Sequence, residues 1–343
     1  MTEKKPVILV IDIGGTNFRL GLVSERLLES STVERYKTPN FYIYEEDIIK
    51  KEIIRLIYDY FIKMSEKYDI HQIMIAFPGP VNSGGQIQGS AVIFGKPLKT
   101  EFNLKRELMD RINNIKIFIT NDMTASTWRY ANSCDSFCLI TISSGIGNKI
   151  FSNGTVLIGE DGLAGEIGHF PVDFDEAEIA CSCGWGNNHL GVIASGRGIG
   201  EIAKKLGEAK YRALFLASPL ARSIDYDINN LTPEIIAVNA DQGDPFSKTI
   251  IDICTKPLAK IISCFSLALY IQKFIFIGGL VLNCRYYLQS LKMNVIKHGI
   301  YNYPVDKINE MLITGENDDD QALIGLIEIS KRNHSQVMLQ NRL

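Results

Sequence analysis

The sequence predicts an α/β protein with two domains of related architecture. Its 343 residues are more than a single hydrophobic core usually accommodates, so two domains are the natural expectation. Apolar runs of strand length alternate with segments of helical periodicity, which is the pattern of an α/β fold. The hairpin-like segment 7–23 has a counterpart at 137–158, and this repetition indicates a duplicated architecture.

Composition and charge argue against several classes of protein. Hydrophobic residues make up 46% of the chain and charged residues 22%, which is ordinary for a globular protein in water. The net charge is −3 and there is no basic run, so we expect no nucleic-acid or membrane partner. Seven cysteines, an odd number, without a recognisable secretory signal favour a cytoplasmic protein over a disulfide framework.

The first element is a strand at Val7–Ile11 that leads to Asp12, a glycine turn and a returning strand. Gly14 and Gly15 are expected to leave backbone N–H groups exposed, and Thr16 adds a hydroxyl. Amide donors beside a carboxylate suit a phosphate carried with Mg²⁺, which Asp12 would face through water. An ordinary tight hairpin is the alternative, because D-x-G-G-T also arises by chance.

A helix is predicted at Tyr44–Tyr68 from its apolar spacing, and a strand at Gln72–Phe77. The strand leads into the loop 78–81, with the sequence PGPV. Because α/β folds usually bind ligands at the carboxyl ends of strands, Gly79 is a candidate substrate contact. A simple turn explains the same residues.

A helix at 106–112 and a buried strand at Ile115–Thr120 precede Asn121 and Asp122, which stand where that strand gives way to a helix at Met123–Tyr130. An acid at this position often caps a helix. The functional alternative is that Asp122 accepts a proton from a substrate hydroxyl while Asn121 holds a neighbouring hydroxyl.

The second hairpin, 137–158, has the same sequence pattern as the first: an apolar strand, a turn of small residues and a returning strand. Ser144, Gly145 and Gly147 in this turn are candidates for a second phosphate loop. The spacing of glycines does not match a dinucleotide-binding fingerprint, and no G-x-x-x-x-G-K-[ST] motif is present.

Two cysteines and two histidines fall at a spacing typical of a metal site. His169, Cys181, Cys183 and His189 supply four ligands of the types that Zn²⁺ prefers. Four protein ligands leave no open position, so the predicted metal would be structural. The alternative is two buried thiols and two unrelated imidazoles.

Near the end of the chain, Pro245–Ile271 has helical periodicity, with Pro257 expected to break or kink the helix. The strand Lys273–Ile277 ends at Gly278 and Gly279, which offer a flat approach for adenine or simply a strand-to-helix turn. The remaining predicted elements are a helix opening at 195–198, a strand at 311–314 and a closing helix at 320–329.

Taken together, these motifs resemble those of the ROK sugar kinases, a branch of the actin, Hsp70 and hexokinase superfold. The resemblance covers nearly the whole chain, in the family's order. It rests on DIGGT at 12–16, PGPV at 78–81, ND at 121–122, SGIG at 144–147, GEIGH at 165–169, CSCG at 181–184, SG at 195–196 and GG at 278–279.

The resemblance implies a two-domain actin-like ATPase fold, also called ribonuclease H-like, with duplicated mixed sheets and an interdomain cleft. The first domain would comprise residues 1–120 and 315–343, and the second residues 121–314 with a zinc-binding loop. The family is often dimeric, so a homodimer is expected.

The resemblance also implies ATP-dependent phosphorylation of a sugar hydroxyl, with the 6-hydroxyl of a hexose or N-acetylhexosamine such as glucose, N-acetylmannosamine or N-acetylglucosamine as the expected acceptor. Asp122 would be the catalytic base. The implied sugar contacts are Gly79, Asn121, Asp122, Glu166 and His169, with His169 also serving the zinc. The implied contacts to ATP and Mg²⁺ are Asp12, Gly14, Gly15, Thr16, Ser144, Gly145, Gly147, Gly278 and Gly279.

Three departures from the family pattern affect the choice of sugar rather than the chemistry. The family's zinc motif is C-x-C-G-x-x-G-C-x-E, but here one residue is inserted and His189 stands at the third cysteine. Gly191 replaces the glutamate that meets the sugar near its first or second carbon, so a hydrogen bond is lost or space is opened. The segment 89–96 lacks the Asn-x-x-Gly-Trp of glucose-type members.

Two other functions are compatible with the fold. Some members of the family are sugar-responsive repressors, but we expect no DNA-binding domain ahead of the first strand. A catalytically silent sugar sensor is the main alternative, against which Asp12, Asp122 and both glycine turns argue. An ATPase that acts on proteins is a weaker alternative, because the GEIGH segment and the zinc cluster favour a sugar.

Overall fold

The computed structural model of the protein describes residues 4–25, 27–82 and 84–332. Its chain divides into two compact units: the first comprises Met1–Ser133, Gly154–Ala164 and Asp318–Leu343, and the second Cys134–Asn153 and Gly165–Asn317. These limits differ from the expected boundary at residue 120, because the segment that follows it packs within the first unit. Residues 333–343 of the expected first domain lie outside the described residues.

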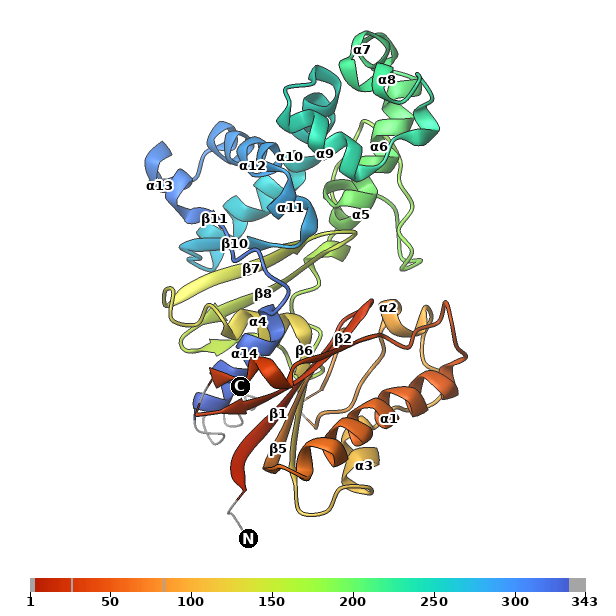
Figure 1. The fold of residues 1–343 in the computed structure, drawn as a ribbon. Helices are drawn as coiled ribbons and strands as arrows, with labels where there is room; N and C mark the ends of the chain where they lie inside the picture. The colour runs from red at the N-terminus through yellow and green to blue at the C-terminus, as the bar shows by residue number, and fades with distance from the viewer. Residues whose placement is uncertain (1–3, 26, 83, 333–343) are drawn as a thin grey trace. The chain divides into compact units, whose positions relative to one another are not determined.

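The first unit contains a mixed sheet with the strand order β3-β2-β1-β5-β6, and β4 also pairs with β2. Strands β1, β5 and β6 run parallel, whereas β2 runs antiparallel to β1 (Figure 1). The strands are β1 (Lys5–Ile13), β2 (Asn17–Ser24), β3 (Leu27–Leu28), β4 (Glu34–Lys37), β5 (Tyr68–Phe77) and β6 (Lys116–Asn121).

Helices cover both faces of this sheet. Ile49, Ile53 and Ile57 lie on one side of α1 and pack with Leu9 and Ile11 in a buried cluster. Helices α4 and α14 pack against each other and against sheet strands. The helices of the first unit are α1 (Glu46–Ser65), α2 (Ala91–Phe94), α3 (Leu104–Met109), α4 (Asp122–Trp128) and α14 (Gln321–Lys331).

A buried ion pair fixes the start of α1. Lys50 Nζ lies 2.6 Å from Glu46 Oε1, and the backbone N–H groups of Lys99 and Thr100 donate to the Glu46 carboxylate. Burial alone would raise the pKa of Glu46, but these hydrogen bonds outweigh it and lower the pKa to about 2. The charged carboxylate therefore ties α1 to the loop at 99–100.

We expect Glu46→Gln to lower stability at neutral pH and to flatten the loss of stability on acidification. A carboxyl with a depressed folded-state pKa contributes fully above its unfolded value, near 4.5, and loses that contribution as the pH falls toward 2. Urea unfolding at several pH values measures this. Glu45→Gln, which changes the exposed neighbour, is the control, and parallel pH curves for wild type and Glu46→Gln would contradict the assignment.

The sheet of the second unit repeats the plan of the first. Its strand order is β11-β10-β7-β8-β9, in which β7 pairs antiparallel with β8 and parallel with β10. The hairpin β7–β8 thus corresponds to β1–β2, and β10–β11 to β5–β6, which confirms the predicted duplication. The strands are β7 (Ser136–Ile142), β8 (Ile146–Ser152), β9 (Thr155–Val156), β10 (Lys273–Ile277) and β11 (Leu312–Thr314), β9 itself falling in the first unit.

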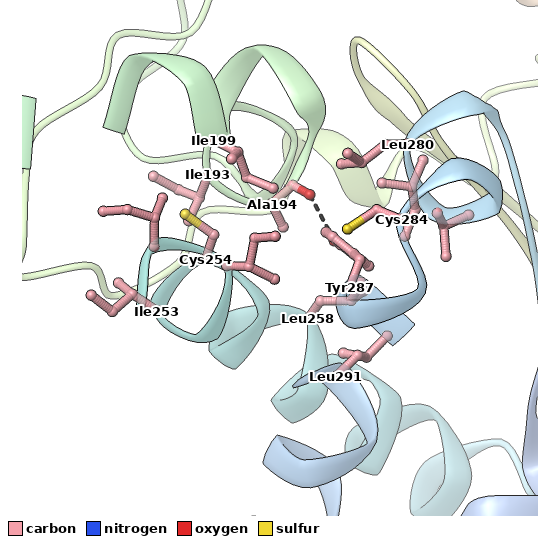
Figure 2. Packing of buried hydrophobic residues seen from close by; sticks show 14 of the residues in the cluster. Ile193, Ala194, Ile199, Ile253, Cys254, Leu258, Leu280, Cys284, Tyr287 and Leu291 are labelled. Atoms are coloured by element: carbon pink, nitrogen blue, oxygen red, sulfur yellow. Dashed lines mark hydrogen bonds between the residues drawn. The ribbon is translucent and has the colours of Figure 1, made fainter. Parts of the chain in front are cut away.

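Helices α5, α10, α11 and α12 meet in the hydrophobic core of the second unit (Figure 2). The hydroxyl of Tyr287, fully buried there, donates to the carbonyl oxygen of Ala194 at 2.7 Å. The helices of this unit are α5 (Leu190–Ala194), α6 (Gly196–Glu208), α7 (Arg212–Ala217), α8 (Pro219–Ser223), α9 (Pro233–Asp241), α10 (Pro245–Ala268), α11 (Gly279–Asn283), α12 (Arg285–His298) and α13 (Val305–Met311).

Helix α10 runs for 24 residues and includes Pro257, so of the predicted break or kink the break does not occur. Pro257 is buried, and α10 packs along α12, which offsets the missing hydrogen bond of the proline. In the described part of the chain no helix combines the length and the apolar character needed to cross a membrane.

Candidate active site

Three parallel strands of the first unit bring predicted site residues to one edge of the sheet. Asp12 lies opposite Ala76 in the β1–β5 register, and Phe77 lies opposite Asn121 in the β5–β6 register. The first glycine turn, the PGPV loop and Asp122 therefore follow neighbouring strand ends. This edge is where α/β folds commonly bind ligands.

Asp12 is a buried carboxylate next to a buried arginine. Arg19 Nη1 lies 3.4 Å from Asp12 Oδ2 and 3.9 Å from Asp320 Oδ1. Burial raises the pKa of Asp12 to about 7 against the opposing effect of Arg19, and the carboxylate of Asp122 adds to the rise. A divalent cation nearby would favour the charged form, so this environment fits the expected Mg²⁺.

The first glycine turn differs from the prediction in one respect. The Gly14 N–H donates to the carbonyl of Asn17 at 2.8 Å, so it closes the hairpin and is not exposed for an anion. Neither Gly14 nor Gly15 has a positive φ. Instead, a β-carbon on Gly14 would lie 3.1 Å from the Asn17 oxygen, and one on Gly15 would lie 3.2 Å from Cβ of Val92. Close packing, rather than backbone conformation, favours glycine here, and Thr16 is exposed beside it.

Asn121, not Asp122, caps helix α4. The Thr124 N–H donates to Asn121 Oδ1 at 3.0 Å, and Asn121 Nδ2 donates to the Gly79 carbonyl at 2.9 Å. Asp122 is half-buried, and its Oδ1 accepts hydrogen bonds from Met123 N–H at 2.7 Å and from Asn121 Nδ2 at 3.0 Å. Asp122 is therefore the first residue of α4 rather than its N-cap, and two hydrogen bonds orient its carboxylate.

Gly79 has a packing role as well. Its φ is +149°, and a β-carbon there would lie 2.1 Å from the carbonyl oxygen of Gly89. Two loops therefore touch at Gly79, whose carbonyl also accepts the hydrogen bond from Asn121 Nδ2. This contact explains the glycine without reference to a substrate.

In the second unit, the turn between β7 and β8 is tied to the start of α6. The Ser143 N–H donates to the Gly145 carbonyl at 3.0 Å. Ser195 Oγ donates to the Ser144 carbonyl at 2.9 Å, and the Gly196 N–H donates to the Ser143 carbonyl at 2.8 Å. The small residues therefore form one connected turn.

The glycines after β10 lie beside the same turn. Gly278 has a φ of +97°, and a β-carbon on it would lie 2.6 Å from the Ile142 carbonyl oxygen. Gly279 follows as the first residue of α11. Gly147 pairs with Thr141 within the β7–β8 ladder, so it belongs to the strand rather than to the turn.

A pocket of about 560 Å³ opens next to this turn, within the second unit. Ser144 and Gly279, both predicted site residues, line it together with Arg197, Lys204 and Pro233. Its volume lies in the range of small-molecule sites. The sequence analysis did not identify Lys204 or the α9 residues that line this pocket, because neither α6 around Lys204 nor α9 carries a recognisable motif.

The GEIGH segment is pressed against strand β8. A β-carbon on Gly165 would lie 2.1 Å from the Asn148 carbonyl oxygen, and one on Gly168 would lie 2.2 Å from the Ile146 carbonyl oxygen. The two glycines thus hold the backbone of the intervening Glu166 against the strand. A larger residue at either end would displace that backbone.

The four predicted zinc ligands come together in the second unit. Their ligand atoms all lie within 4.8 Å of one another. Cys181 Sγ is 3.7 Å from His169 Nδ1, and Cys183 Sγ is 3.4 Å from His189 Nδ1. A tetrahedral Zn²⁺ with ordinary bond lengths separates its sulfur and nitrogen ligands by about 3.5 Å. The arrangement therefore fits a closed zinc site, with His189 in the place expected for a cysteine.

Gly191, which stands where the family motif has glutamate, packs on the GEIGH segment. A β-carbon at Gly191 would lie 2.9 Å from the carbonyl oxygen of Gly168. The backbone therefore occupies part of the space that the missing side chain was expected to open.

Comparison with known proteins places this arrangement in a family. The model of the ROK family matches residues 8–333. The C(7)-cyclitol 7-kinase of Streptomyces hygroscopicus subsp. jinggangensis is 31% identical over 332 residues, which cover 94% of this chain and 93% of that protein. The chain belongs to the ROK family. The family match spans residues of both units, which confirms the family predicted from the sequence.

Solved ROK structures share the fold. A ROK family glucokinase from Streptomyces griseus, in complex with glucose and AMPPNP, has a TM-score of 0.65 at 20% identity, covering 94% of this chain and 98% of that one. A ROK family transcriptional regulator, homologous to the E. coli MLC protein, has a TM-score of 0.77 at 19% identity, covering 98% and 81%. Both confirm the predicted actin-like fold class, and neither likeness distinguishes a kinase from a regulator.

Proposed function

We propose that this ROK family protein is an ATP-dependent kinase that phosphorylates a hydroxyl of a ring polyol, either a hexose or N-acetylhexosamine at its 6-hydroxyl or a cyclitol. The observation that carries the proposal is the position of the Asp122 carboxylate, which Asn121 and the Met123 N–H orient just after β6, at the same edge of the sheet as Asp12 in β1. The similarity to a cyclitol kinase over 94% of the chain supports the kinase class and adds cyclitols to the candidate acceptors.

The proposed chemistry assigns each residue a defined task. Asp122 takes the proton of the acceptor hydroxyl as that oxygen bonds to the γ-phosphorus of ATP, and the bond from the phosphorus to the bridging oxygen breaks to release ADP. Asn121 and Gly79 hold the neighbouring part of the acceptor. Glu166 and His169 of the second unit are assigned to the acceptor's other hydroxyls.

Phosphate binding is assigned to Asp12, Gly15 and Thr16 in the first unit and to the turn containing Ser144 and Gly145 in the second. Mg²⁺, when bound, supplies charge neutralisation on the transferring phosphate. Asp12 would hold it through water; this carboxylate is buried, and in the described part of the chain Arg19 is the one cationic side chain that pairs with it. We assign the pocket of about 560 Å³ to the nucleoside of ATP.

We expect about one zinc ion per chain, held by the Cys181, Cys183, His169 and His189 cluster. Cys183→Ser should lower the bound zinc and the melting temperature together, since a structural metal stabilises the fold that forms its site. Plasma emission spectrometry and thermal unfolding measure the two effects. Cys264→Ser, at an exposed cysteine outside the cluster, is the control. A zinc-free protein with unchanged stability would contradict this assignment.

A panel of acceptors tests the proposed function. ADP release is measured with glucose, N-acetylmannosamine, N-acetylglucosamine and a C7-cyclitol, each against a sample without acceptor. We expect release only with a subset of the panel. Acceptor binding without any ADP release would indicate a sugar sensor, and release independent of every acceptor would indicate an ATPase. We further propose that the protein is cytoplasmic and forms a homodimer, and light scattering after gel filtration tests the homodimer.

A further inference from the structure

A second pocket, of about 350 Å³, lies within the first unit and along the outer edge of β6. On its other side β6 pairs with β5, and no other described strand pairs with it. Five consecutive β6 residues, 116–120, line the pocket, and α3, α4 and the 155–158 segment complete its walls. The residues that define the proposed active site, Asp12 and Asp122 included, do not line it.

One buried hydroxyl in this pocket has no partner among the described residues. Thr124 lines the pocket and is 5% exposed, yet its Oγ1 makes no hydrogen bond there. A buried polar group that is left unpaired destabilises the folded protein. A ligand that reached this hydroxyl would remove that destabilisation, so the orphaned atom itself points to a ligand.

The charge of the lining points to an anion. Lys105 and Lys116 line the pocket, neither forms an ion pair among the described residues, and none of the described lining residues is acidic. Apolar side chains make up most of the remaining wall, with Ile117, Phe118 and Ile119 on the β6 side. A ligand that satisfies this lining has an apolar body and an anionic group that meets the lysines.

We propose that this pocket binds a small apolar carboxylate, at a site separate from those assigned to ATP and to the acceptor. The apolar body lies against the isoleucines of β6, and the carboxylate oxygens accept hydrogen bonds from the Thr124 hydroxyl and from the lysines of the lining, Lys105 and Lys116. Thr124 and Trp128 belong to helix α4, which begins at Asp122, so the ligand contacts the helix that carries the proposed base. Binding at this pocket does not depend on the proposed function.

The fluorescence of Trp128 can report binding at this pocket. Of its two tryptophans, Trp128 lines the pocket and is 3% exposed, whereas Trp185 is in the second unit and 91% exposed. In a full-length Trp185→Phe background the emission of Trp128 is followed during titration with cyclohexanecarboxylate. Cyclohexylmethanol, which has the same ring and no charge, is titrated in parallel.

We expect a saturable change in Trp128 emission, with the alcohol bound about tenfold more weakly than the carboxylate, which corresponds to about 1.4 kcal/mol. The double change Lys105→Met and Lys116→Met should remove the preference for the carboxylate. Lys67→Met, at an exposed lysine of the same unit, should keep it. No saturable change in the Trp185→Phe protein, or equal affinity for the acid and the alcohol, would overturn the proposal.

Thr124→Val gives an independent readout. The valine has nearly the same shape and removes the unpartnered hydroxyl, so the fold should be kept or stabilised while carboxylate binding weakens severalfold. Unfolding in urea confirms that the variant is folded. Carboxylate binding by Thr124→Val with wild-type affinity would show that the hydroxyl does not contact the ligand and would overturn the proposed geometry.

Discussion

Asp122→Asn should lower kcat by about 10²- to 10⁴-fold while leaving the fold intact, because an amide cannot take the proton of the acceptor hydroxyl. An asparagine keeps an oxygen at Oδ1, so the hydrogen bond from Met123 N–H, 2.7 Å in the wild type, is retained. The helix cap is also retained, since Asn121 supplies it. The effect should therefore fall on turnover, with a smaller change in the KM for the acceptor.

Steady-state kinetics with a saturating acceptor measure the effect, and thermal unfolding checks the fold. Asp110→Asn, which changes an exposed acid of the same unit, is the matched control and should keep full activity. If Asp122→Asn retained near-wild-type kcat, Asp122 would not be the base. A large fall in both kcat and melting temperature would instead indicate a structural role.

Gly325→Ala should be destabilising, because helices α4 and α14 touch at this residue. A β-carbon on Gly325 would lie 1.7 Å from the carbonyl oxygen of Ala125 and 2.4 Å from its carbonyl carbon. The helices would have to separate, and overpacking of this kind costs about 1–3 kcal/mol, occasionally more. The gain of helix propensity from alanine, about 1 kcal/mol, opposes part of that cost. Urea unfolding measures the difference.

Two further variants separate the backbone contact from side-chain effects. Ser330→Ala, on the same helix but away from the contact, should change stability by less than about 0.5 kcal/mol. Adding Ala125→Gly to Gly325→Ala should not restore stability, because the predicted clash is with the backbone oxygen and not with the alanine side chain. Because α4 begins at Asp122, kcat should fall with stability. Wild-type stability of Gly325→Ala would show that the two helices adjust without cost.

Local patterns in the sequence predicted the elements that carry the site. The apolar runs before Asp12, Asn121 and Gly278 are strands because buried parallel strands read as continuous apolar segments. The first and last residues of these strands were less predictable. Strand β5 begins at Tyr68 rather than at the predicted Gln72, since its first residues interrupt the apolar run and are held by pairing with β1.

Helix α12 shows why other elements were missed. Two of its buried residues, Ser290 and Asn294, are polar and weaken the apolar pattern on which the prediction relied. Both are satisfied by α10: Ser290 Oγ donates to Asp252 Oδ1 at 2.6 Å, and Asn294 Nδ2 donates to Thr255 Oγ1 at 2.9 Å. Such pairing between distant segments is not visible in the local sequence.

Contacts between distant segments were also what the sequence could not predict at the candidate site. The spacing of residues predicted that four ligands meet near Cys181, and their ligand atoms do lie together. It did not reveal that Arg19 lies beside Asp12, that Asn121 takes the capping role, or that the Gly14 N–H closes its own hairpin. These features depend on side-chain geometry and strand register rather than on motif identity.

Transfer of labelled phosphate tests the central claim most directly. The protein is incubated with ATP labelled with ¹⁸O at every γ-phosphate oxygen, Mg²⁺ and an acceptor that supports ADP release, and the products are analysed by mass spectrometry. Direct transfer predicts an acceptor phosphate ester that carries three ¹⁸O atoms, with its ester oxygen unlabelled because that oxygen comes from the acceptor. Labelled inorganic phosphate without any acceptor ester would contradict the proposed kinase.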